Sequence, residues 1–227
     1  MLLPLWSVHS TLKIKKVKGE SVNYLERMRI LREGESFDGV SCLTAGEKLG
    51  HGNAAEIETC EFLRGLARRE KMDLVIHTGT HKGADVAWIA SGLYENGIGY
   101  PHLKGEIVTV DVDDHNPRGL WNRLELDNIT HIIGDSTNPQ TYAGKIPRSC
   151  GWAHLDADHS AENLLMEFEA LLPYFSMRRC IVSSHDTRLD VRLAPGINEI
   201  LRRLRKIRDD GQGWRLISHW PTRSLRG

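Results

Sequence analysis

Residues 74–83 read LVIHTGTHKG, and this stretch decides the fold class. The apolar run at 74–76 predicts a buried strand, and the glycine-containing segment at 79–83 predicts a turn. Residues 84–93 then predict a helix. A strand, a turn and a helix in this order are typical of α/β proteins whose strands pair in parallel.

The alternation of predicted strands and helices continues along the chain. Further strands are expected at 106–112, 129–133, 152–156, 180–183 and 214–219, with helices at 120–126, 160–172 and 197–207. Such alternation implies right-handed crossovers and helices on both faces of the sheet. We therefore expect an α/β fold with a doubly wound, mostly parallel, Rossmann-like sheet.

The first part of the chain lacks this alternation. We divide the sequence into an N-terminal extension or lid at 1–52 and the α/β domain at 53–227. In the extension, residues 11–17 alternate weakly and suit an edge strand, and 22–32 suit a short helix. The loop at 33–53 is rich in glycine, serine and charge, which fits either a lid over a site or a decorated surface.

Composition narrows the classes of partner. The chain has 227 residues, 40% of them hydrophobic, and its 30 basic and 30 acidic residues cancel. Bulk charge therefore gives no attraction to nucleic acid or anionic membranes. No apolar stretch approaches the roughly 20 residues that span a bilayer, and residues 1–8 lack the features of a signal peptide. The four cysteines are Cys42, Cys60, Cys150 and Cys180. They are far apart and form no CxxC pair, which favours a cytoplasmic location.

Three predicted strands end in residues that suit a nucleotide-like cofactor, because ligands of open parallel sheets bind beyond the carboxyl ends of the strands. Gly79 and Gly83 let the backbone approach a ligand, and the next helix offers free N–H groups. Asp111 can bind both hydroxyls of a ribose, and Asp135 with Ser136 can contact an adenine edge. The glycines alone fit an ordinary turn, but the ordered set favours a cofactor. Their spacing differs from the GxGxxG dinucleotide fingerprint, which disfavours NAD and FAD.

Acids and histidines follow two other predicted strands, in the segments LDADHS at 155–160 and SSHDT at 183–187. Neighbouring parallel strands lie about 4.8 Å apart, so Asp156 and Asp186 could reach one ion. Mg²⁺ prefers such oxygen ligands. His185 is a candidate third ligand that would favour Mn²⁺ or Fe²⁺ instead.

His159 is the candidate general base, because an imidazole titrates near neutral pH. The alternative for these segments is structural. Asp156 would then cap the next helix, His159 would be a turn residue and Asp186 would begin a loop. Asp158 better fits a helix N-terminal charge than a ligand.

At these motifs the chain resembles the class I S-adenosylmethionine-dependent methyltransferases over roughly residues 53–220. More narrowly it is similar to the cephalosporin-hydroxylase-like, rhamnosyl and macrocin-type O-methyltransferases, which are metal-dependent. The two acid–histidine segments are the most specific part of the resemblance. It implies S-adenosylmethionine and a divalent metal, foremost magnesium, as cofactors. The implied cofactor-binding residues are His77, Gly79, Thr80, Gly83, Asp111, Asp135 and Ser136.

The chain departs from this family at two places. The family usually has an acid two residues before the first glycine, where this chain has His77, and an imidazole cannot replace the charge of a carboxylate. The family's sheet commonly ends in a seventh, antiparallel strand. Only seven residues follow Trp220, so we expect that strand to be missing, very short or supplied from elsewhere.

The predicted function is transfer of a methyl group to a hydroxyl of a small molecule, such as a sugar or secondary metabolite. A non-catalytic protein that binds an adenosyl ligand is the alternative, and a nicotinamide-dependent oxidoreductase is a weaker one. The predicted helix at 197–207 and the residue after it carry a basic face, formed by Arg202, Arg203, Arg205, Lys206 and Arg208. Such a face suits either solvent or a nucleic acid. No Asn-Pro-Pro-Tyr-type motif supports a nucleic-acid methyltransferase. We expect no membrane partner, and a homo-oligomer is compatible with the sequence.

Overall fold

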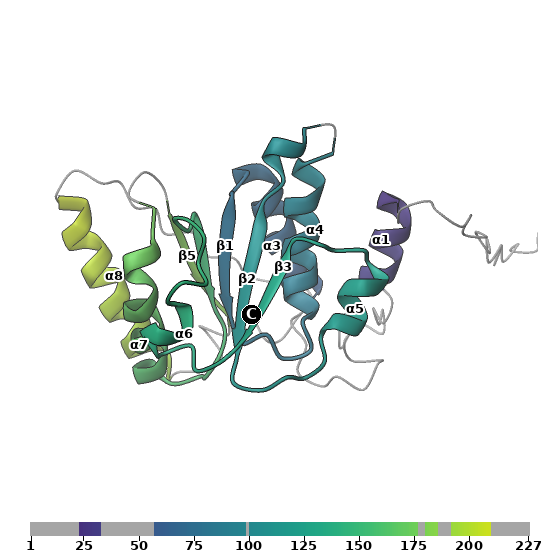
Figure 1. Ribbon diagram of the computed structural model, residues 1–227. Coiled ribbons are helices and arrows are strands. Elements are labelled where there is room, and N and C mark those ends of the chain that lie inside the picture. Colours follow the sequence, from purple (N-terminus) through teal and green to yellow (C-terminus); the bar gives the residue numbers. More distant parts are fainter. Residues whose placement is uncertain (1–22, 33–56, 99, 177–179, 186–191, 210–227) are drawn as a thin grey trace, which may run out of the picture.

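Five strands of the described residues form a parallel sheet at the centre of the fold (Figure 1). The computed structural model describes residues 23–32, 57–98, 100–176, 180–185 and 192–209. The strands are β1 (Leu74–Thr78), β2 (Glu106–Asp111), β3 (Ile129–Ile133), β4 (Trp152–Leu155) and β5 (Ile181–Ser184). They lie in the order β3-β2-β1-β4-β5, and every neighbouring pair is parallel. The predicted Rossmann-like fold class is confirmed.

The order of the strands reverses between β1 and β4, so the sheet has its topological switch point there. The carboxyl ends of these two strands are therefore where a ligand site is expected. The predicted sixth strand at 214–219 lies outside the described residues, as do the expected edge strand at 11–17 and the loop at 33–53.

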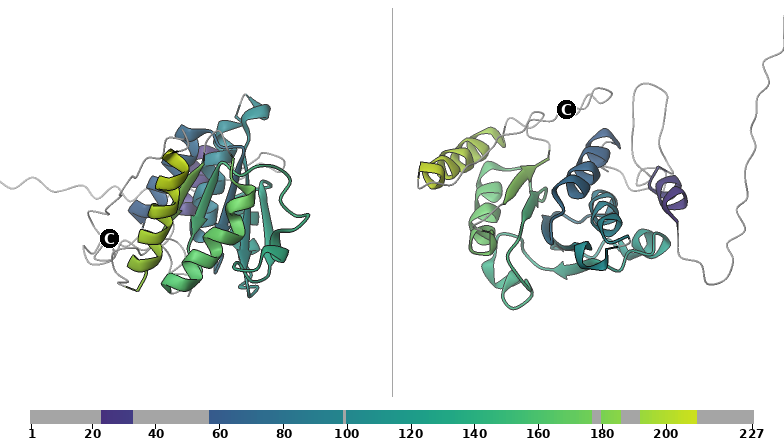
Figure 2. Two further views of the ribbon diagram at one scale, coloured as in Figure 1. Left: turned by 90° about the vertical axis from the view of Figure 1, so that its left-hand side faces the viewer. Right: turned by 90° about the horizontal axis from the view of Figure 1, so that it is seen from above.

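Helices cover both faces of the sheet, which gives three layers (Figures 1 and 2). One face carries α1 (Tyr24–Leu31), α3 (Ile57–Glu70), α4 (Ala84–Asn96) and α5 (Arg118–Arg123). The other carries α6 (Pro139–Tyr142), α7 (Ala161–Leu171) and α8 (Ala194–Asp209). Two short 3₁₀ helices, η1 (Pro101–Leu103) and η2 (Leu172–Tyr174), complete the described helices. The sequence did not predict α6 or these two turns.

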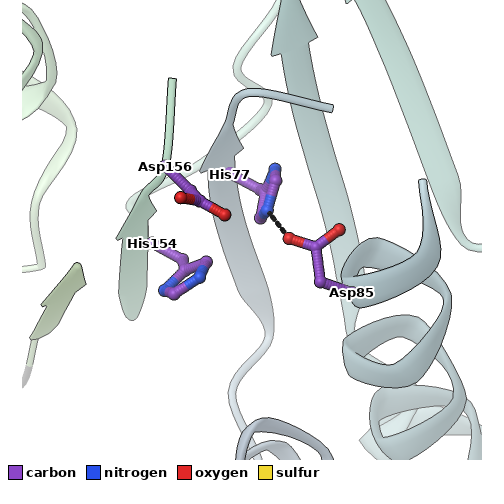
Figure 3. A group of neighbouring side chains, drawn as sticks. All are labelled: His77, Asp85, His154 and Asp156. Atoms are coloured by element: carbon purple, nitrogen blue, oxygen red, sulfur yellow. Dashed lines mark hydrogen bonds and ion pairs between the residues drawn. The ribbon is translucent and has the colours of Figure 1, made fainter. Parts of the chain in front are cut away.

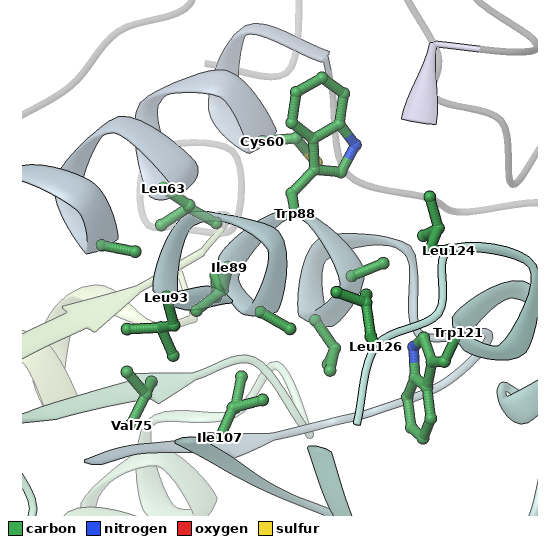
Figure 4. Close-up of a cluster of buried hydrophobic side chains, with 14 of the residues drawn as sticks. Cys60, Leu63, Val75, Trp88, Ile89, Leu93, Ile107, Trp121, Leu124 and Leu126 are labelled. Atoms are coloured by element: carbon green, nitrogen blue, oxygen red, sulfur yellow. The ribbon is translucent and has the colours of Figure 1, made fainter. Parts of the chain in front are cut away.

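The alternation of side chains along each strand sends them to separate cores. Val75 of β1 and Ile107 of β2 face α4 near Leu93 (Figure 4). The fully buried Trp88 belongs to the same core and lies on the other side of α4, beside Cys60. Leu74 and Ile76 face the opposite side, in the cluster that includes α7 and α8. Both faces of the sheet are apolar, as expected for a parallel sheet covered on both sides.

Helix α1 lies within the expected N-terminal extension, yet it packs on the α/β domain. Ile30 and Leu31 are 4% and 1% exposed and belong to the same core as α4. Arg27 is also buried, and its Nε donates a hydrogen bond to the Leu124 carbonyl at 3.3 Å. Its guanidinium group lies 4.3 Å from the centre of the Tyr94 ring, a cation–π contact.

None of the described helices combines the length and the apolar character that crossing a membrane requires.

Candidate functional site

The turn after β1 comes very close to the chain after β4. Gly79 has φ +78°, and its N–H donates to the Val110 carbonyl at 2.9 Å. A Cβ at Gly79 would lie 1.9 Å from the carbonyl oxygen of Asp156. Only glycine fits this backbone conformation and this close approach. The turn therefore lies directly against the first acid–histidine segment.

The second glycine of the turn has a packing role at the start of α4. Gly83 has φ +71°, and a Cβ there would lie 2.7 Å from the Trp121 ring and from the side chain of Pro117. Trp121 Nε1 donates to the Gly83 carbonyl at 3.0 Å. Contacts within the protein therefore require both glycines. This agrees with the alternative that the sequence allowed, an ordinary turn between a strand and a helix. Their role toward a cofactor stays a prediction.

His77 is fully buried at the end of β1 and contacts Asp85 in the first turn of α4 (Figure 3). The distance from His77 Nε2 to Asp85 Oδ2 is 2.6 Å, and the one from His77 Nδ1 to Thr109 Oγ1 is 3.1 Å. Burial by itself lowers the pKa of His77, but the charge of Asp85 and its hydrogen bond raise the pKa above 6.5 overall. Burial by itself raises the pKa of Asp85, but the contact with His77 outweighs it and lowers that pKa overall. The imidazole and the carboxylate therefore form a buried pair.

Thr80 is also turned into the protein. Its side chain is 1% exposed, and its hydroxyl lies 2.6 Å from the hydroxyl of Thr109. Thr109 thereby connects Thr80 to His77 in one hydrogen-bonded chain. The predicted cofactor residues His77 and Thr80 are hence buried under the turn, whereas Asp111 is partly exposed beyond β2.

Asp111 and Asp135 lie after β2 and β3. Asp111 Oδ2 accepts from the His81 N–H at 2.7 Å and Oδ1 from the Asp113 N–H at 3.1 Å. Each oxygen retains a second lone pair for a ligand hydroxyl. Asp135 is exposed, and its Oδ1 accepts from the N–H and the hydroxyl of Thr137 at 2.8 and 2.7 Å. Ser136, beside it, is 6% exposed.

The first acid–histidine segment meets the second, as predicted. Asp156 Oδ1 lies 3.5 Å from His185 Nδ1 and 3.7 Å from His159 Nε2. The Asp156 N–H donates to Thr78 Oγ1 at 3.1 Å, which ties this segment to β1. Burial raises the pKa of Asp156, and the neighbouring His185 opposes that rise. Residue 186, the other predicted metal ligand, lies outside the described residues.

Asp158 has the structural role that the sequence favoured. It accepts a hydrogen bond from the Ser160 hydroxyl at 2.8 Å, and Ser160 caps α7 by accepting from the Asn163 N–H at 3.2 Å. Its carboxylate thus belongs to the start of the helix.

Comparison with known proteins agrees with this arrangement. Residues 76–187 match a protein family described as a methyltransferase domain. The chain is similar to a solved O-methyltransferase from Bacillus cereus in complex with S-adenosylhomocysteine, at 20% identity and a TM-score of 0.52, covering 70% of this chain and 72% of that one. It is also similar to the O-methyltransferase TomG of Streptomyces achromogenes, involved in tomaymycin synthesis and solved with S-adenosylmethionine, at 13% identity and a TM-score of 0.56, covering 71% and 74%.

A third similar structure is the apo form of TDP-rhamnose 3′-O-methyltransferase, an enzyme of calicheamicin biosynthesis. It has 19% identity and a TM-score of 0.53, covering 73% of this chain and 76% of that one. No curated protein sequence matches the chain significantly.

The chain contains a class I S-adenosylmethionine-dependent methyltransferase domain.

The resemblance seen in the sequence is thereby confirmed at the level of the class I methyltransferases, and the protein is an enzyme of that kind. The narrower group, the metal and the site residues stay predictions.

Two buried polar residues of the methyltransferase domain were missed in the sequence. His154 lies on β4 with its ring 2% exposed, and its Nδ1 is 2.7 Å from Ser183 Oγ. Burial lowers the pKa of His154 to about 3, so the ring is neutral. Glu167 is fully buried on α7, and burial raises its pKa to about 7. The signal for Glu167 was a single acid on the apolar face of the helix, between Leu164 and Phe168.

Proposed function

We propose that the protein transfers the methyl group of S-adenosylmethionine to a hydroxyl group of a small molecule, with assistance from a divalent metal ion. The observation that carries this proposal is the Asp156 carboxylate, with the imidazoles of His159 and His185 on it. These groups lie at the switch point of a methyltransferase sheet, next to the glycine turn. A ligand carboxylate and a base at that position suit activation of a hydroxyl.

The cofactor would bind along the carboxyl ends of β1, β2 and β3. In this proposal Gly79 and Gly83 line its methionine part through their backbone. The Asp111 carboxylate, held by two backbone N–H groups, takes the ribose hydroxyls. Asp135 and Ser136 lie on the adenine side.

The metal ligands in this proposal are Asp156, His185 and Asp186. Asp156 Oδ1 and His185 Nδ1 lie 3.5 Å apart, and small adjustments bring two such atoms onto one ion. The carboxylates favour magnesium, and the imidazole would favour a softer ion such as Mn²⁺. When bound, the ion supplies Lewis-acid polarisation and a template for the acceptor oxygens.

His159 is the proposed general base. Its side chain is 38% exposed, so an acceptor can reach it, and its Nε2 lies 3.7 Å from the Asp156 carboxylate. In the transfer, the acceptor oxygen bonds to the methyl carbon while the carbon–sulfur bond breaks and leaves its electron pair on sulfur. The hydroxyl proton passes to His159, and the nearby carboxylate stabilises the imidazolium that forms.

The proposed acceptor is a hydroxylated small molecule of the sugar or secondary-metabolite class. The similarity in fold to the TDP-rhamnose methyltransferase and to TomG supports this choice. The balanced charge of the chain, 30 basic against 30 acidic residues, gives no support to a nucleic-acid acceptor.

Calorimetry with S-adenosylmethionine and S-adenosylhomocysteine, with and without Mg²⁺, tests the cofactor first. Failure to bind either ligand would refute the proposal. Release of S-adenosylhomocysteine is then measured with a panel of hydroxylated sugars and phenols. Cofactor binding without turnover on any acceptor would favour the non-catalytic alternative.

Two variants test the roles of the residues. Asp156→Asn should abolish stimulation by metal, and Asp158→Asn is the matched control, because the Asp158 carboxylate accepts from Ser160 at the start of α7. His159→Asn should lower kcat about 10²- to 10⁴-fold and remove the ionisation of the base from the pH profile. Metal stimulation that persists in the Asp156 variant would rule out only the metal role.

A further inference from the structure

Four side chains of the methyltransferase domain form a buried cluster between the sheet and the start of α4 (Figure 3). His77 comes from β1, His154 from β4, Asp156 from the residue after β4, and Asp85 from the first turn of α4. Each offers one ligand atom, and these four atoms lie within 4.8 Å of one another. His77, His154 and Asp85 are 0%, 2% and 7% exposed, whereas the side chain of Asp156 is 16% exposed, so three of the four ligand residues are buried.

One ring nitrogen of this cluster is left unpaired by the described residues. His154 Nε2 is buried and finds no hydrogen-bond partner among the described residues. The other ring nitrogen, Nδ1, lies 2.7 Å from Ser183 Oγ, and that oxygen accepts a hydrogen bond from Trp152 Nε1 at 2.7 Å. Leaving a polar atom buried and unpaired is unfavourable, so such an atom calls for an explanation.

The surroundings of both imidazoles match those of metal-bound histidines. A histidine that binds a metal through one nitrogen usually donates the N–H of the other to a fixed acceptor. Ser183 is that acceptor for His154, and Thr109 Oγ1 lies 3.1 Å from Nδ1 of His77. In both rings Nε2 is then left for the centre of the cluster.

The contact between His77 Nε2 and Asp85 Oδ2, at 2.6 Å, is also compatible with an ion. Two ligand atoms bound to one ion at about 2.0 to 2.2 Å lie roughly 3 Å apart. An ion would therefore replace the proton now shared by the two atoms and would need only a small separation of the side chains.

We propose that His77, Asp85, His154 and Asp156 bind one divalent first-row transition-metal ion. Two neutral imidazoles and two carboxylates carry a charge of −2, which such an ion neutralises inside the protein. The mixture of nitrogen and oxygen ligands without thiolates suits Zn²⁺, Fe²⁺ or Mn²⁺, whereas Mg²⁺ and Ca²⁺ take oxygen ligands.

This site is distinct from the one proposed for acceptor activation and does not depend on it. The two share only Asp156, whose Oδ1 is the atom near His159 and His185. The buried ion would link β1, β4 and α4 directly beneath the turn at Gly79. The role assigned to this ion is therefore structural: it would hold the turn at Gly79 against the chain after β4.

Cobalt(II) is a suitable probe, because its visible absorption reports nitrogen and oxygen ligands in a low-coordinate site. The full-length protein is treated with a chelator, dialysed and titrated with Co²⁺. We expect intense ligand-field bands that saturate at one equivalent and a higher unfolding temperature with the metal bound. Absence of both effects in the folded wild-type protein would overturn the proposal.

His154→Asn should weaken Co²⁺ binding by more than about 100-fold, since it removes a ligand. Its matched control is His131→Asn, because His131 is a histidine of β3 whose ring nitrogens are likewise buried and unpaired among the described residues, but it lies outside the cluster. Ser183→Ala is a milder variant that keeps all four ligands and should weaken binding about 10- to 100-fold.

His185→Ala separates the two sites. The cobalt bands should persist in this variant if the ion lies in the buried cluster. Bands that are lost in His185→Ala and retained in His154→Asn would place the ion in the outer site and overturn the proposal. Calorimetry with S-adenosylmethionine on the same samples reports the proposed function separately.

Discussion

Replacing Glu167 by glutamine should stabilise the protein at neutral pH. Glu167 lies on α7 with no exposed surface, and both its carboxylate oxygens lack a hydrogen-bond partner among the described residues. The hydroxyls of Ser136 and Thr78 lower its pKa, but neither makes a hydrogen bond of normal geometry with it. Of the nearby charges, Asp156 raises its pKa and His77 lowers it. Burial dominates, so the ionised form is unfavourable.

The size of the effect follows from the pKa of Glu167, which burial raises from 4.5 to about 7. Below pH 4.5 the folded and unfolded states are both protonated, and the full stability is present. Between 4.5 and 7 the unfolded chain releases this proton first, so the free energy of unfolding falls by about 1.4 kcal/mol per pH unit. Above pH 7 the loss is complete, at about 3 kcal/mol. Glu167→Gln removes this loss.

Urea unfolding of the wild type and of Glu167→Gln, followed by tryptophan fluorescence across this pH range, measures the difference directly. The variant should gain about 3 kcal/mol relative to the wild type between the two ends of the range. Glu162→Gln, at an exposed position of the same helix, is the matched control for the substitution. The burial argument is refuted if the difference between Glu167→Gln and wild type does not change with pH.

Two further substitutions test the packing. Gly79→Ala should destabilise the protein by at least about 2 kcal/mol more than Gly144→Ala. Both glycines have positive φ, but only the Cβ at 79 would collide with the Asp156 carbonyl, and equal losses in urea unfolding would contradict this. Arg64→Met should destabilise the protein by about 2 kcal/mol, because the Glu95 side chain, 5% exposed, loses Arg64 at 2.7 Å and keeps only the 3.2 Å contact with Arg68. The double variant with Glu95→Gln should recover part of that loss in the same assay, and no recovery would count against a buried charge as the cause.

The local pattern of the sequence was enough to place the sheet. The runs at 129–133 and 152–156 are short and mostly apolar, and polar residues or glycine flank them. They therefore predicted β3 and β4 within one residue. The four-residue helix Pro139–Tyr142 was missed because it is too short to show a helical period.

The pairing of Asp156 with His185 was predictable because parallel strands bring their carboxyl ends to one edge of the sheet. The partnership of His77 with Asp85 was not. The sequence showed an imidazole where the family has an acid, but the carboxylate comes from the helix after the turn. Whether a side chain eight residues away points back into the sheet depends on the turn geometry, which the sequence pattern does not specify.

The sequence by itself determined that this chain forms strands with buried faces, turns with glycine and a parallel sheet with helices on both sides. Only the tertiary structure decided the strand register, and with it one polar row across the sheet. His131, Thr109, His77, His154 and Ser183 pair in succession from β3 to β5. The alternation along a strand assigns each side chain to one of two faces. A shift of one residue between neighbouring strands would change those faces, and only the packing of both apolar cores fixes the register.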